Sequence, residues 1–144
     1  MSSENITTGK IAFMFPAQFN VEGASSPTLN FKARYDGTVA MSIGISFLEL
    51  DPKSPYFVKL SLKDSHDNDV PISSGMDAIP PNQIDPIRKS SFLTASFNFK
   101  AEIAGTHKFT CELIQPLSGS MSLDSKNVLF NIIAYSELTW RMET

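Results

Sequence analysis

The sequence predicts an all-β protein, a single antiparallel β-sandwich of about seven to eight strands. Segments in which apolar and polar residues alternate recur along the chain, and this alternation is the signature of a strand with one buried face. Clusters of Gly, Pro, Asn, Asp and Ser separate these segments at the short spacing that is typical of a sandwich. No segment shows the periodicity of an amphipathic helix. A closed barrel is the alternative architecture.

Length and composition predict one globular domain. The 144 residues are enough to bury roughly two-thirds of the surface of the unfolded chain in a single core. Hydrophobic residues make up 42% of the chain, and eleven phenylalanines against one tryptophan predict a core built largely from Phe. We expect residues 1–10 to form a flexible N-terminus and residues 11–140 to form the β-sandwich domain.

The charge pattern excludes two classes of partner. The formal net charge is -3 and no run of Lys or Arg is present, so we expect binding neither to nucleic acid nor to anionic membranes. No apolar stretch approaches the roughly eighteen residues of a membrane helix, and the N-terminal segment lacks the features of a secretory signal. The single Cys111 has no partner for an intramolecular disulfide. A cytoplasmic location is therefore expected.

Two alternating runs around Gly105 form the centre of the pattern. In residues 91–101 the odd positions from Leu93 to Ala101 are apolar, and after Gly105 the odd positions from His107 to Leu113 are apolar again. The two strands either pair directly as a hairpin or belong to opposite sheets. Their apolar stripes match in both arrangements, so the alternation does not decide between them.

Residues 105–111 read G-T-H-K-F-T-C, which resembles the late strand of immunoglobulin-like domains, where a glycine precedes an aromatic residue and then alternating core residues. The resemblance implies that Phe109 and Cys111 are core positions and that the flanking strands belong to opposite sheets. It also implies that His107 replaces the usual tyrosine and makes a local backbone hydrogen bond.

The first strand is predicted over residues 11–21, with an apolar stripe on the odd positions. Pro16 interrupts its other face, so this strand is expected at a sheet edge or with a bulge at Pro16. Residues 29–35 and 39–47 are the next two strands. A three-residue loop that ends at Gly37 would pair Ala33 with Val39, with Gly37 in the left-handed conformation.

Three further strands are predicted, over residues 58–62, 70–72 and 128–135. The last of them is apolar on both faces, which predicts a central strand or one whose second face is covered by another chain. Between these strands we expect loops over residues 73–90 and 116–126.

Cys111 and His107 are a candidate nucleophile and base. Four residues along a strand span about 13 Å, whereas a nucleophile and its base need roughly 3 Å. We therefore expect Cys111 to be a small buried hydrophobe and His107 a satisfied core histidine. No catalytic constellation is visible, and the sequence predicts neither an enzyme nor a cofactor.

The turn D-S-H-D-N-D offers Asp64, His66, Asp67 and Asp69 as ligands for a metal or small molecule. The calcium loop of EF-hands needs glycine at its sixth position and glutamate at its twelfth, where this chain has Asp69 and Gly75. A solvated turn is the preferred interpretation.

The loop over residues 73–90 and the last strand carry the candidate binding residues. Loops on a rigid sandwich often bind partners, and the alternative is that the isoleucines of this loop cap the open end of the sandwich. On the last strand, apolar residues on the second face predict a contact surface, which is covered either by the C-terminal segment, by the loop over residues 73–90, or by a second chain in a homodimer, the alternative that we favour. The residues concerned are Met76, Ile79, Ile84, Ile87, Arg88, Leu129, Ile133, Tyr135 and Trp140.

The sequence thus favours a non-enzymatic binding or structural module that acts through protein contacts. The alternative is a protein that binds a small ligand or metal through the loops at residues 64–69 and 73–90.

Overall fold

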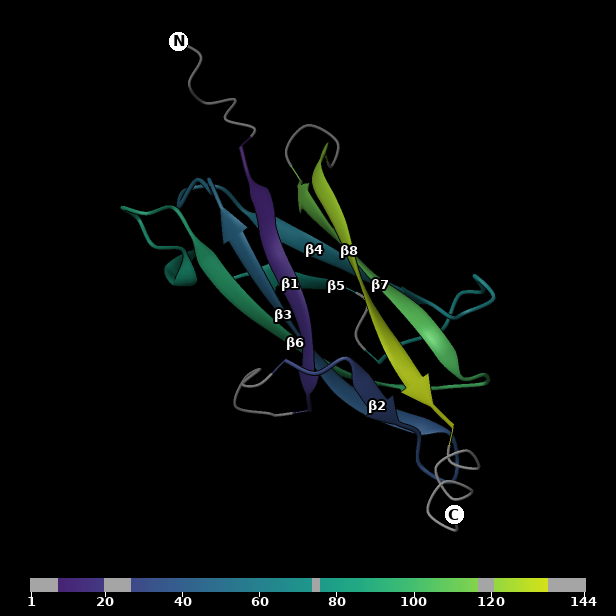
Figure 1. Cartoon of the computed structure of the whole chain (residues 1–144). Helices are drawn as coiled ribbons and strands as arrows, with labels where there is room; N and C mark the ends of the chain where they lie inside the picture. Colours follow the sequence, from purple (N-terminus) through teal and green to yellow (C-terminus); the bar gives the residue numbers. More distant parts are fainter. Residues whose placement is uncertain (1–7, 20–26, 74–75, 117–120, 135–144) are drawn as a thin grey trace.

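The computed structural model describes residues 8–19, 27–73, 76–116 and 121–134, and in this part the chain forms a sandwich of two β-sheets (Figure 1). The predicted all-β sandwich is confirmed. The described residues contain no helix that is long and apolar enough to cross a membrane. The three-stranded sheet has the order β1 (Lys10–Gln18), β3 (Thr38–Leu48), β6 (Ser91–Lys100). The five-stranded sheet has the order β2 (Asn30–Lys32), β8 (Met121–Ile133), β7 (Gly105–Gln115), β4 (Tyr56–Lys63), β5 (Met76–Ile79).

Neighbouring strands are antiparallel, except that β2 runs parallel to β8. The described chain also contains a short 3-10 helix, η2 (Pro81–Gln83), between β5 and β6. The strands β6 and β7, which follow each other along the chain, lie in opposite sheets. This outcome decides between the two arrangements that the sequence left open, and it agrees with the one found in immunoglobulin-like domains.

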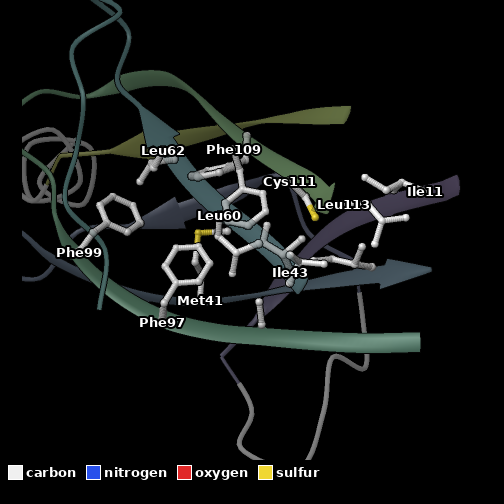
Figure 2. Packing of buried hydrophobic residues seen from close by; sticks show 14 of the residues in the cluster. Ile11, Met41, Ile43, Leu60, Leu62, Phe97, Phe99, Phe109, Cys111 and Leu113 are labelled. Atoms are coloured by element: carbon white, nitrogen blue, oxygen red, sulfur yellow. The ribbon is translucent and has the colours of Figure 1, made fainter. Parts of the chain in front are cut away.

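The core lies between the two sheets and is built from the predicted apolar stripes (Figure 2). Phe97 of β6 stacks on Phe109 of β7, with ring centroids 5.4 Å apart, and so joins the sheets. His107 is fully buried beside Phe99 and Phe130. Its Nδ1–H donates to the carbonyl oxygen of Gly105 over 3.0 Å, so the local hydrogen bond expected of His107 is present. Its Nε2 is buried without a hydrogen-bond partner among the described residues, so the prediction of a fully satisfied histidine is wrong.

The predicted hairpin around Gly37 is wrong. Strand β2 pairs with β8, whereas β3 pairs with β1 and β6, so the chain changes sheets at this turn. The turn is closed by hydrogen bonds from Arg34 N–H to Thr38 O and from Gly37 N–H to Arg34 O. Gly37 has φ +88°, the left-handed conformation that was predicted. The hairpin was predicted because the apolar stripes of the two strands match. Matching stripes are also found in two strands of opposite sheets, because both direct their apolar side chains into the same core.

Strand β1 lies at an edge of its sheet, as predicted, but its apolar stripe is not the one expected. Its pairing with β3 shifts register between Ile11 and Phe13 and not at Pro16. An extra residue at a bulge reverses which side chains face the core. Ile11, which precedes the bulge, is buried as predicted, and so is Ala17, whereas beyond the bulge Phe13 is exposed and Pro16 is buried.

The boundaries of two other elements also differ from the prediction. Residues 76–79, expected in a loop, form β5 against β4, whereas in residues 70–72 the strand prediction is reduced to one isolated bridge, between Ile72 and Phe99. Strand β8 begins at Met121 and not at residue 128. The sequence did not predict the early part of β8 as a strand, because charged residues lie on its core-facing side, next to the edge of β1. There Asp124 Oδ2 accepts the N–H of Ile11 over 2.9 Å, and the neighbouring Lys126 is exposed. Inward-facing charges of this kind protect a strand edge from further pairing.

Candidate interaction face

The two outer faces of the sandwich differ in charge. On the five-stranded sheet, the outward positions of β4 and β7 include Lys59, Lys63, Lys108 and Glu112. On the three-stranded sheet, the described outward residues between Lys10 at one end and Lys100 at the other are all uncharged. A solvated face normally carries charges, so the three-stranded sheet has the unusual surface.

Aromatic rings form a row on this uncharged face. Phe13 and Phe15 project from β1, with ring centroids 6.4 Å apart and planes inclined by 20°. Phe15 in turn stacks on Phe92 of β6, at 6.2 Å and 26°. Phe13 is 56% exposed and Phe92 is 45% exposed. Large aromatic side chains left open to water in one place are typical of contact surfaces.

Small residues of β3 allow the rings to approach one another. Gly44 pairs with Phe15, and Ser46 pairs with Phe13 on one side and Phe92 on the other. A Cβ on Gly44 would lie 2.6 Å from Cζ of Phe15, so the glycine leaves room for this ring. Leu48, 46% exposed, follows at the next outward position of β3. We call the four residues Phe13, Phe15, Leu48 and Phe92 the aromatic patch.

A rigid turn borders the aromatic patch. Asp85 Oδ1 accepts the N–H groups of Ile87 and Arg88, each over 2.9 Å, and Lys89 N–H donates to Asp85 O over 2.7 Å. The side chain of Ile87 at the tip is 87% exposed. The turn leads directly into β6, one residue before Phe92. An apolar side chain that is held out by a hydrogen-bonded turn loses little conformational entropy on binding.

The loop residues predicted from the sequence have two different environments. Ile87 and Arg88 are exposed, as a contact requires. Ile79 and Ile84 are buried at 2% and 3% exposure, so their side chains belong to the core and are not available to a partner in this conformation. Ile79 lies in β5, paired with Tyr56, and Ile84 follows η2. Met76 is the first residue of β5.

The second face of β8 is less apolar than the sequence suggested. Leu129 is 54% exposed, but its partner across the strand is Lys108. Asn131, whose Nδ2–H donates to Asn30 Oδ1, separates Leu129 from the partly buried Ile133. The described residues of this face therefore form no continuous apolar patch. Tyr135 and Trp140 lie outside the described residues.

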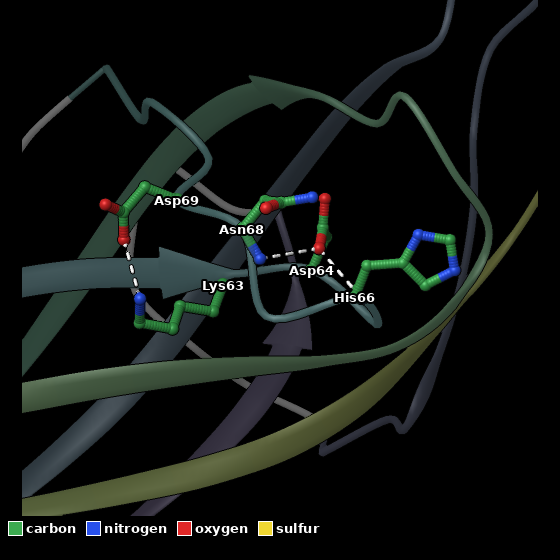
Figure 3. A network of polar contacts seen from close by, with 5 residues as sticks. All are labelled: Lys63, Asp64, His66, Asn68 and Asp69. Carbon is green, nitrogen blue, oxygen red and sulfur yellow. Dashed lines mark hydrogen bonds and ion pairs between the residues drawn. The ribbon is translucent and has the colours of Figure 1, made fainter.

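The acidic turn is occupied by its own hydrogen bonds (Figure 3). Asp64 Oδ1 accepts the N–H groups of His66 and Asn68, and Asp69 pairs with Lys63 over 2.9 Å. The turn borders an open hollow of about 400 Å³ that Lys100 also lines. Among the residues that the structure describes, no group of three or more His, Cys, Asp and Glu is arranged to hold a metal ion.

Cys111 and His107 both lie on β7 and are fully buried. Burial raises the pKa of the Cys111 thiol to about 12. Because the thiolate is the nucleophilic form, this side chain is inert at neutral pH. The structural role expected of Cys111 is the one that its position supports.

Sequence reasoning missed the aromatic patch. Phe13 and Phe15 were assigned to the core because the bulge in β1 leaves no signal in the alternation. Phe92 did leave a signal, since it is a large apolar residue at the start of the even-numbered, otherwise polar face of β6. The small uncharged residues at the even positions of β3, including Gly44, were a second signal.

No protein-family model matches this sequence, and no curated protein matches it. The fold itself occurs in solved structures. A glycosyl hydrolase family 2 member from Bacteroides cellulosilyticus superposes with a TM-score of 0.57 at 5% identity, over 85% of this chain and 15% of that chain. A β-glucuronidase from Bifidobacterium dentium gives 0.54 at 12% identity, over 86% and 18%. The chain thus spans less than a fifth of either protein, and likeness at these identities concerns the fold alone.

Proposed function

We propose that this chain is a non-enzymatic binding module, which acts through protein–protein contacts made by the aromatic patch and the Ile87 turn. The observation that carries the proposal is the row of stacked rings Phe13, Phe15 and Phe92 on an uncharged sheet face, in which Phe13 and Phe92 are exposed and Phe15 between them is partly buried. Aromatic residues are enriched, and charged residues depleted, at the centres of protein interfaces.

The chemistry of the patch favours a protein over other partners. Nucleic acids and anionic membranes are recognised by Lys and Arg, and the described outward residues of this face contain none between its ends. The adjoining Arg88 is paired with Asp85 over 3.2 Å, and Lys89 gives the turn one net positive charge, which is far less than the Lys and Arg cluster that nucleic acids or anionic membranes need. The predicted absence of nucleic-acid and membrane binding, and the cytoplasmic location, remain predictions.

Binding of a small ligand or metal at residues 64–69 is the weaker candidate. The carboxylate of Asp64 already accepts two backbone N–H groups of its own turn, from His66 and Asn68. A turn that is closed in this way is typical of a solvated structural loop. We therefore place the function at the aromatic patch.

Site-specific photo-crosslinking in the native host tests the proposal. A photoreactive phenylalanine analogue is introduced at Phe92 in one variant and, as a matched control, at Leu129 in another, since the two side chains are similarly exposed on opposite sheets. We expect covalent protein adducts from position 92 and few from position 129. Equal yields at the two positions, or adducts from position 129 alone, would contradict the proposal.

A further inference from the structure

We infer that the aromatic patch binds a second copy of this chain, so that two molecules pack through the outer faces of their three-stranded sheets. The inference rests on the proposed function, because it uses the same patch and names its partner. It differs from the dimer that the sequence suggested, which used the second face of β8.

The edges of the three-stranded sheet are partly occupied. At the edge of β1, Thr28 N–H donates to Pro16 O over 2.9 Å. At the edge of β6, Ser73 N–H donates to Asn98 O over 3.1 Å, and Asn98 N–H donates to Ser73 Oγ over 2.9 Å. Addition of a strand along the whole of either edge would break these bonds. Association through this sheet is therefore favoured at its face.

The charge distribution suits two identical surfaces. Each chain has a formal net charge of -3, so two copies repel each other over most orientations. The aromatic patch is uncharged, the ion pairs beside it, Lys10 with Glu49 and Arg88 with Asp85, are each neutral in sum, and Lys89 adds one positive charge at the rim. When two patches meet, each cation at the rim can approach an anion of the other copy. Two copies of the chain can thus meet at the patch without bringing charges of the same sign together there.

The geometry of the patch fits a two-fold arrangement. In a symmetric pair the same residues meet on both sides, and sheets packed face to face lie about 10 Å apart with strands near parallel. Ser46, which lies between Phe13 and Phe92, is at the centre of the patch and hence close to the expected two-fold axis. A three-stranded face is only about 14 Å wide. We therefore expect a small interface and a weak dimer.

Sedimentation equilibrium of the purified full chain over a range of concentrations tests the inference. We expect a monomer–dimer equilibrium for the native chain and for Leu129→Asp, which places a charge on the other sheet. Phe92→Asp is expected to weaken dimerisation at least tenfold, because it buries a carboxylate in the contact. Circular dichroism and thermal unfolding establish that both variants are folded.

Cysteine crosslinking locates the contact. Because Cys111 is buried, the native chain provides a silent background. With a bis-maleimide crosslinker that spans about 10 Å, the expected separation of facing sheets, we expect Ser46→Cys to form a covalent dimer and the control Ser61→Cys, at an exposed position of the opposite sheet, to remain monomeric. A native chain that is monomeric at several hundred micromolar overturns the inference, and so does a dimer that survives Phe92→Asp. If photo-crosslinking from position 92 still captures a different protein, the proposed function stands without the dimer.

Discussion

The ring of Phe15 occupies the space that a side chain at position 44 would need, since a Cβ on Gly44 would come within 2.6 Å of its Cζ and within 3.0 Å of Cζ of Phe92. The φ angle of Gly44 lies outside the left-handed region, so the backbone conformation does not require glycine. Glycine at position 44 is therefore explained by the rings that cover it. It is needed by the aromatic patch and not by the fold.

Substitution Gly44→Val is expected to disturb the patch while leaving the sandwich intact. The new side chain displaces the rings of Phe15 and Phe92, which lie at the surface and can move. A β-branched residue also suits a strand better than glycine, so we expect the free energy of unfolding to change by less than about 1 kcal/mol. Nuclear Overhauser contacts between the two rings and urea unfolding measure the two effects. Loss of folding would show that Gly44 has a structural role instead.

The inward half of the fold was predictable from the sequence, because burial imposes a strict alternation on each strand. The stripes from Val39 to Phe47 and from Leu93 to Phe99 face the core as expected. The pairing of strands was not predictable in the same way. An apolar stripe specifies a buried face but not the sheet to which its strand belongs, which is why β2 and β3 were wrongly joined.

The candidate site was harder to predict, for a physical reason. The bulge between Ile11 and Phe13 reverses the direction of the side chains that follow, and a bulge depends on the partner strand more than on local sequence. Ile87 was identified because prolines and charges mark its loop, but the same signal also selected Ile84, which is buried. Composition identifies a loop and does not show which of its residues face water.

Two phenylalanines on β6 provide a matched comparison between core and surface. Phe97 is 1% exposed and stacks on Phe109 across the core. We expect Phe97→Ala to lower the free energy of unfolding by about 3–5 kcal/mol, since it removes buried contacts and leaves a cavity. Phe92→Ala is expected to cost less than about 1 kcal/mol, because its ring lies at the surface. Urea unfolding of both variants checks this, and equal losses would contradict an outward position for Phe92.

Cys111 is expected to be unreactive in the folded chain. Its thiol is fully buried, and burial raises its pKa to about 12, so almost no thiolate forms at pH 8. Ellman's reagent is expected to label the chain only as fast as it unfolds, and to label it completely in 8 M urea. Rapid labelling of the folded chain would show that the thiol is accessible. In Cys111→Ser a buried hydroxyl replaces the thiol, with an expected cost of about 1–3 kcal/mol.

The stability of the acidic turn is expected to depend on pH. The hydrogen bond from the backbone N–H of Asn68 is the main cause that lowers the pKa of Asp64 below 3.8, and the N–H of His66 contributes in the same direction. Because the pKa is lower in the folded chain, the contribution of this carboxylate to stability is complete above about pH 4 and is lost as the pH falls through the folded value.

Amide exchange of His66 and Asn68, measured between pH 5 and pH 2.5 and corrected for intrinsic rates, is expected to show a loss of protection over this range. The variant Asp64→Asn keeps an acceptor oxygen but no charge, so its protection at these amides is expected to be weaker at pH 5 and to change little on acidification. Equal pH dependence in the native chain and in Asp64→Asn would mean that another group controls the turn.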